Sequence, residues 1–199
     1  MKHSSGLSLV QVQPNPAAIP APLRYYDPEL QNAWNVEPFD NERLMRAQTK
    51  GMKLHAAYLR QVATLAPRLS KQTFSHVAAI RSPLFDADLV AFSFGDLLGH
   101  AAPRKRRKRL ETTVQATFRS FEEDKLHLLA YRNIAALNVN VPADRWFDAG
   151  GNKRIDSLLA DELTNVDATL MQHAFLFASG AAISIQFEHV SWKTKRISC

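Results

Sequence analysis

Alternation of apolar and polar residues in the second half of the chain most strongly limits how it can fold. The clearest case is a pair of runs on either side of Ser179-Gly180. Alternate side chains of a strand point to opposite faces, so such runs predict a β-hairpin with one buried face and one solvated face. The residues expected on the buried face are His173, Phe175, Phe177, Ile183, Ile185 and Phe187.

The same period of two recurs earlier in the chain. It predicts strands over 89–94, 113–119, 126–131 and 137–141, with the acidic run 122–124 as one of the turns. Strands that follow one another through short turns favour antiparallel pairing. The sequence therefore predicts a mostly antiparallel sheet of about six strands.

Two helices are predicted before these strands. Apolar residues recur every three or four positions from Asn41 to Ala66, and Pro67 ends this pattern. Ser70 offers an N-cap for a shorter second helix, which should end before Ser82-Pro83. We expect an α+β fold in which both helices pack on one face of the sheet.

The N-terminal 39 residues differ from the rest of the chain in composition. They hold six of the ten prolines, which bias a chain toward extended geometry. We expect 1–39 to be an extended, partly disordered arm that docks through aromatic side chains at its end, and 40–199 to be a single domain. The docking aromatics are Tyr25, Tyr26, Trp34 and Phe39.

One short segment accounts for the positive charge of the protein. Six of the 25 Lys and Arg residues are consecutive, and the remaining 19 equal the 19 acidic residues. A cationic cluster can bind an acidic protein, nucleic acid phosphates or anionic lipid, but this one lacks interleaved aromatics and follows a proline, as in a solvated hairpin loop. The six residues are Arg104, Lys105, Arg106, Arg107, Lys108 and Arg109.

Several classes of protein are disfavoured by the composition. The single cysteine, Cys199, cannot form an intramolecular disulfide or a cysteine-based zinc site. No apolar run approaches the length that crosses a bilayer, so we expect a cytoplasmic protein without a membrane span. The last strand, Ile183 to Val190, is expected to allow homodimer formation if it lies at a sheet edge.

A polar site can be assembled from a few acidic and histidine residues. Asp86 and Asp88 are two positions apart, so on a strand they would share one face, although a turn carboxylate that accepts backbone hydrogen bonds has the same pattern. Glu162, His173 and His189 could supply two imidazoles and a carboxylate to a metal. The two histidines lie at unequal distances from the hairpin turn, so we expect neither a bound metal nor a cofactor.

Short motifs give the chain a resemblance. Leu84-Phe85-Asp86-Ala87, Asp161-Glu162-Leu163 and the run His173 to Phe177 resemble segments of a family of small uncharacterised bacterial α+β proteins. In that family a Leu-His-Asp-Ala turn follows the helices and a His-x-x-Leu-Phe hairpin ends the sheet. Phe85 stands here in place of the family's histidine. The resemblance implies an immunity-type protein of a bacterial toxin system.

The sequence favours binding over catalysis. No nucleophile elbow, phosphate-binding loop or dinucleotide fingerprint occurs, so we expect a protein that is not an enzyme. The expected function is a protein-binding module with an acidic partner, for which the resemblance implies an immunity-type role. Nucleic-acid binding through 104–109 is the alternative, and a metal-dependent hydrolase that uses Asp86, Asp88, Glu162 or His173 is the third.

Overall fold

The computed structural model describes residues 23–26, 41–79, 81–94, 112–120, 124–141 and 157–197. Most of the proline-rich arm, including Trp34 and Phe39, lies outside the described residues. So do the six-cation segment 104–109 and Cys199. The domain boundary at residue 40 therefore stays a prediction.

Both predicted helices are confirmed. Helix α2 spans Asn41–Leu65 and continues into a short 3-10 turn, η1, over Ala66–Arg68. Helix α3 spans Lys71–Val77. Its N-cap is the predicted serine, since the Ser70 hydroxyl accepts a hydrogen bond of 3.1 Å from the backbone N–H of Thr73.

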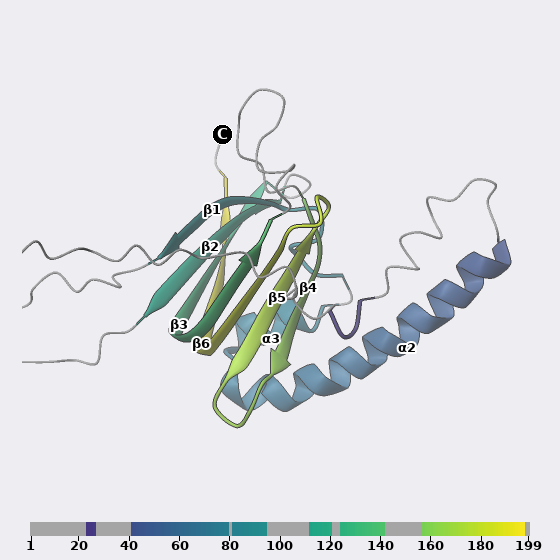
Figure 1. The fold of residues 1–199 in the computed structure, drawn as a ribbon, viewed down its shortest axis with the longest axis horizontal. Coiled ribbons are helices and arrows are strands. Elements are labelled where there is room, and N and C mark those ends of the chain that lie inside the picture. Colours follow the sequence, from purple (N-terminus) through teal and green to yellow (C-terminus); the bar gives the residue numbers. More distant parts are fainter. Residues whose placement is uncertain are drawn as a thin grey trace, which may run out of the picture.

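A six-stranded antiparallel sheet follows the helices, which confirms the predicted α+β class (Figure 1). The strand order is β1-β2-β3-β6-β5-β4. Strands β1, β2 and β3 pair in chain order, as do β4, β5 and β6, and the two longest strands, β3 and β6, join these halves of the sheet. The bounds are β1 Asp88–Phe94, β2 Thr113–Ser120, β3 Lys125–Asn140, β4 Leu158–Asn165, β5 Met171–Phe177 and β6 Ala182–Arg196.

Two strands differ from the prediction. Strand β3 runs without interruption from Lys125 to Asn140, so 137–141 is not a separate strand. A bulge between Ile134 and Ala136 shifts its register, next to Asn133, whose φ of 56° lies in the left-handed region. Strand β4 was not predicted, because its sequence, LLADELTN, does not alternate and contains Ala, Asp, Glu and Asn, which are depleted in strands.

The last strand, β6, is not an outermost strand of the sheet. It pairs with β3 on one side along most of its length, and with β5 on the other side from Ala182 to Phe187. Within the described part of the chain the outermost strands are β1 and β4. Homodimer formation through an edge strand stays a prediction.

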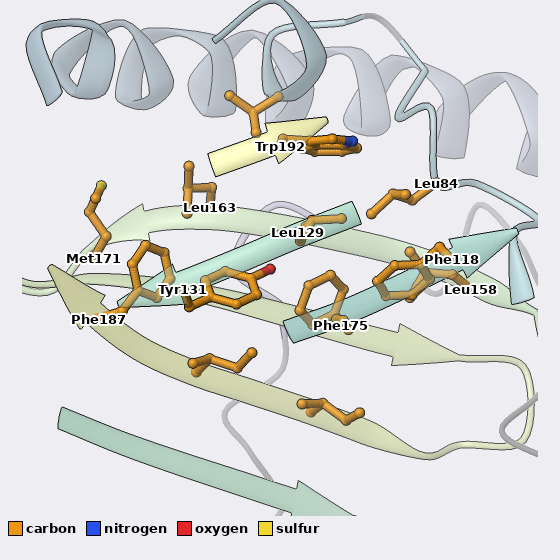
Figure 2. Packing of buried hydrophobic residues seen from close by; sticks show 14 of the residues in the cluster. Leu84, Phe118, Leu129, Tyr131, Leu158, Leu163, Met171, Phe175, Phe187 and Trp192 are labelled. Carbon is orange, nitrogen blue, oxygen red and sulfur yellow. The ribbon is translucent and has the colours of Figure 1, made fainter. Parts of the chain in front are cut away.

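The core lies between the helices and one face of the sheet, and Figures 1 and 2 show α2 and α3 on the same side. The Tyr58 hydroxyl of α2 accepts a 3.2 Å hydrogen bond from the backbone N–H of Leu163 on β4. On α3, the His76 ring packs 4.8 Å from Trp192 of β6. Aromatic rings from β2 and β5 fill the centre (Figure 2), among them Phe118 and Phe175.

Within the described part of the chain, no helix combines the length and the apolar character needed to cross a membrane.

Candidate functional site

The predicted pair Asp86 and Asp88 does not form a joint acidic site. Asp86 makes an ion pair of 3.2 Å with Arg81, and both side chains are more than half exposed. Asp88 begins β1 and accepts a 2.9 Å hydrogen bond from the Ser157 hydroxyl. Each carboxylate thus has its own partner. The turn interpretation fits Asp86, whose φ of 60° is typical of an Asp in a tight turn.

Glu162 and His173 lie on neighbouring strands, but they do not meet. In the β4–β5 pairing, Leu163 is the residue opposite His173. Successive side chains of a strand alternate between faces, so Glu162 and Leu163 point to opposite sides of the sheet. The group that reaches the imidazole is the neighbour of Glu162: Asp161 Oδ2 lies 3.0 Å from His173 Nε2.

His173 links Asp161 to a tyrosine. The Tyr131 hydroxyl lies 2.8 Å from His173 Nδ1, so the imidazole bridges two strands (β3 and β4) across the buried face. Figure 2 shows the ring of Tyr131 inside the apolar layer, beside Phe187. The side chains of His173 and Asp161 are only 1% and 3% exposed. Three polar groups therefore form one buried chain of hydrogen bonds.

One tautomer of His173 gives each of these hydrogen bonds one donor and one acceptor. Burial, and secondarily the charge of Asp161, raise the pKa of Tyr131 well above its ordinary value, so its hydroxyl keeps its proton. In the tautomer that carries the imidazole proton on Nε2, this hydroxyl donates to Nδ1. Nε2 then donates to the carboxylate of Asp161. Each contact has one donor and one acceptor.

The other carboxylate oxygen of Asp161 lacks a partner. Among the described residues, Oδ1 accepts no hydrogen bond although it is buried. Nε2 of His55, on α2, is likewise buried and has no hydrogen-bond partner among the described residues. Buried polar atoms are nearly always hydrogen-bonded in folded proteins, and a buried carboxylate oxygen is especially costly to leave without a donor.

Asp161 and His55 line the same cavity. Its volume is about 270 Å³, and its walls come from α2, α3, the segment that follows α3, strand β4 and residues 23–26. The wall carries four aromatic rings besides the polar groups. These rings belong to Tyr25, Tyr26, Tyr58 and Phe85. We call this space the Asp161 cavity.

Tyr25 and Tyr26 line the Asp161 cavity, and Glu162 holds the segment to which they belong, residues 23–26, which we call the strap. The Glu162 carboxylate accepts backbone N–H groups of Arg24 at 2.9 Å and Tyr25 at 2.6 Å. The ring of Tyr25 lies 5.5 Å from that of Tyr58. Glu162 is thus an anchor for the chain that precedes α2, a role that its sequence context did not indicate.

Burial affects the ionisation of both anchoring residues. It raises the pKa of Glu162, although backbone N–H groups of the strap lower it in part. Burial, followed by the charge of Asp161, also raises the pKa of Tyr58, whose hydroxyl therefore stays neutral. Tyr58 can pack in the cavity wall without adding a charge.

A histidine and a tryptophan support the cavity from the sheet side. His76 lines the cavity and packs its ring on Trp192. The Trp192 indole N–H donates a 3.2 Å hydrogen bond to Nδ1 of His127, a residue that is itself almost fully buried. The imidazole of His76 is therefore fixed from behind rather than mobile in the cavity.

Comparisons with known proteins add no relative to this geometry. Among the described residues no three His, Cys, Asp or Glu side chains come together as a metal site. No protein-family model matches the chain, and neither characterised proteins nor solved structures gave a match. Sequence reasoning singled out Glu162 and His173 but missed Asp161, Tyr131 and His55.

Proposed function

We propose that this protein binds a small organic molecule in the Asp161 cavity. The observation that carries the proposal is that two buried polar atoms without partners, Asp161 Oδ1 and His55 Nε2, belong to walls of one cavity. A ligand with hydrogen-bonding groups would supply a partner to each of these two atoms. Ligand sites are commonly concave spaces with mostly apolar walls and a few placed polar groups.

The size of the cavity suits a molecule of one or two rings. Its volume of about 270 Å³ exceeds the roughly 150 Å³ of an engineered cavity that accepts benzene. It lies just below the usual range of ligand pockets, about 300 to 1,000 Å³. A macromolecular segment longer than one or two side chains would not fit.

The polar wall is held in place before any ligand arrives. His173 fixes one oxygen of Asp161, and Tyr131 fixes His173. Groups that are already ordered lose little conformational freedom on binding, which favours affinity. The proposal requires no turnover, and we keep the sequence-based expectation of a protein that is not an enzyme.

A fragment screen tests the proposal. We expect ligand-observed NMR to find fragments of one or two rings that bind the wild-type protein. Binding should be lost in Ala79→Leu, which places a larger side chain in the cavity wall. Ala63→Leu, on an exposed position of α2, is the matched control and should bind as the wild type does. No fragment hits, or hits that Ala79→Leu leaves intact, would overturn the proposal.

Docking of a protein partner is a second candidate function, favoured by the run of six cations at 104–109 and by the cationic first half of α2. Arg46, Lys50 and Lys53 line one side of this helix beside the exposed Met45. An acidic partner of the immunity type would complement these charges. Stoichiometric co-purification from the native cell, lost when 104–109 are replaced by Ser and Gly, would support it.

Nucleic-acid binding remains the alternative use of the same cations. A salt-dependent mobility shift with duplex DNA or RNA, abolished by the same replacement, would favour it over a protein partner. If the mobility shift is retained after the replacement, residues 104–109 do not account for nucleic-acid binding.

A further inference from the structure

The charge of Asp161 decides which chemistry the cavity can accept. Its Oδ2 receives the Nε2–H of His173, and the chain then ends at Tyr131. These contacts occupy only one of the two carboxylate oxygens. Oδ1 is left as a buried acceptor that has no donor among the described residues.

The charged residues nearest the cavity are already engaged. Arg81 lines the cavity, but its guanidinium is paired with Asp86 and lies 4.4 Å above the Phe85 ring. Its side chain is 58% exposed, so solvent screens its charge. The Glu162 carboxylate is occupied by strap N–H groups. Asp161 is therefore the acidic residue of the cavity wall whose second oxygen, Oδ1, has no donor among the described residues.

The aromatic walls favour the same kind of ligand. Tyr25, Tyr26 and Tyr58 contribute aromatic rings to the wall of a carboxylate-bearing cavity. Aromatic faces attract cations, and the attraction grows when water is excluded. An ammonium group also carries two or three donors, enough for both Asp161 Oδ1 and His55 Nε2. An anion would face Asp161 and leave Oδ1 without a donor.

We infer that the ligand of the Asp161 cavity is a small organic cation, a primary or secondary ammonium group on an aromatic or apolar body of one or two rings. This inference rests on the proposed ligand-binding function and adds the chemical class. Asp161 and His55 would bind the ammonium group, while the tyrosines and Phe85 would contact the body.

Three probes of nearly equal size test the inference by calorimetry near neutral pH. They are 2-phenylethylamine, which is a cation, phenylacetamide, which is neutral but has two donors, and phenylacetate, which is an anion. We expect the amine to bind at least about tenfold more tightly than the amide, because a hydrogen bond between two charged groups is markedly stronger than one to a neutral donor. Phenylacetate should bind most weakly.

Substitutions assign the preference to one carboxylate. Asp161→Asn should reduce the affinity for the amine to about that for the amide. Glu188→Gln removes one negative charge from β6 at a residue that does not line the cavity, and it should leave the preference unchanged. If Asp161→Asn does not fold, the cation inference is tested by the affinities of the three probes for the wild-type protein.

The outcomes separate the two proposals. If the amide or phenylacetate binds more tightly than the amine, the cation inference is overturned. The proposed binding site still stands in that case, provided that the probe competes with fragments whose binding Ala79→Leu abolishes. The cation inference also fails, and the binding site also stands, if none of the three probes binds but other fragments do. If neither these probes nor any fragment binds, the proposed function fails as well.

Discussion

The imidazole of His173 lies between Asp161 and Tyr131, with Nε2 at 3.0 Å from the carboxylate and Nδ1 at 2.8 Å from the hydroxyl. Its neighbours on the same face are apolar, including Phe175, whose ring lies 4.2 Å away. A polar chain inside an apolar layer destabilises a fold unless every member is satisfied. Here Oδ1 of Asp161 has no hydrogen-bond partner among the described residues, and Asp161 belongs to the wall of the cavity.

The first prediction concerns the end of this chain. Tyr131→Phe removes the hydroxyl that lies 2.8 Å from His173 Nδ1 without changing the ring, and it leaves a buried ring nitrogen without this partner. We expect the free energy of unfolding to fall by about 1 to 3 kcal/mol, as measured by urea denaturation. Thr64→Ala, which removes an exposed hydrogen bond to Asn165, should change it by less than about 0.5 kcal/mol. Equal effects of the two substitutions would contradict the buried chain.

The second prediction concerns the ionisation of two tyrosines. Burial raises the pKa of both Tyr58 and Tyr131 above the ordinary value of 10.0. Neither should ionise at about pH 11, one unit above that value, while the protein stays folded. Ultraviolet absorbance of tyrosinate should therefore rise equally at this pH in the wild type, in Tyr58→Phe and in Tyr131→Phe. A smaller rise in either variant would show that its tyrosine titrates normally.

The third prediction concerns the packed rings on β5. Phe177 is fully buried and stacks 6.5 Å from Phe118, whereas Phe94 on β1 is 53% exposed. Phe177→Ala should lower the free energy of unfolding by about 3 to 5 kcal/mol, through lost burial and the cavity left behind. Phe94→Ala is the matched control and should cost less than about 1 kcal/mol. A comparable loss in both variants, by chemical denaturation, would contradict this core.

Periodicity predicted the parts of the fold that one strand or helix specifies by itself. The hairpin around Gly180 and the helix from Asn41 could be predicted because their own residues alternate or recur at helical spacing. Strand β4 could not, because Asp161 and Glu162 break the alternation. An acidic residue that is buried against a partner elsewhere in the chain looks like a solvated residue in its local sequence.

The site depends on pairings that no local pattern encodes. Asp161 meets His173 because the β4–β5 register places Leu163 opposite that histidine, and Tyr131 joins them from β3, beyond the intervening β6. His55 comes from α2, more than a hundred residues before His173. Only the three-dimensional fold brings such residues together. The sequence signal was limited to a buried-face histidine, His173, in an apolar alternation.

The last prediction uses the anchor of the strap. Burial raises the pKa of Glu162 above its ordinary value of 4.5. Between these two pKa values the folded protein binds more protons than the unfolded chain, so the free energy of unfolding falls as the pH rises above about 4.5 and levels off above the folded-state pKa. Glu162→Gln should lack this contribution, and denaturation at several pH values should show a flatter profile. If Glu162→Gln keeps the wild-type profile, Glu162 is not a buried anchor of the strap.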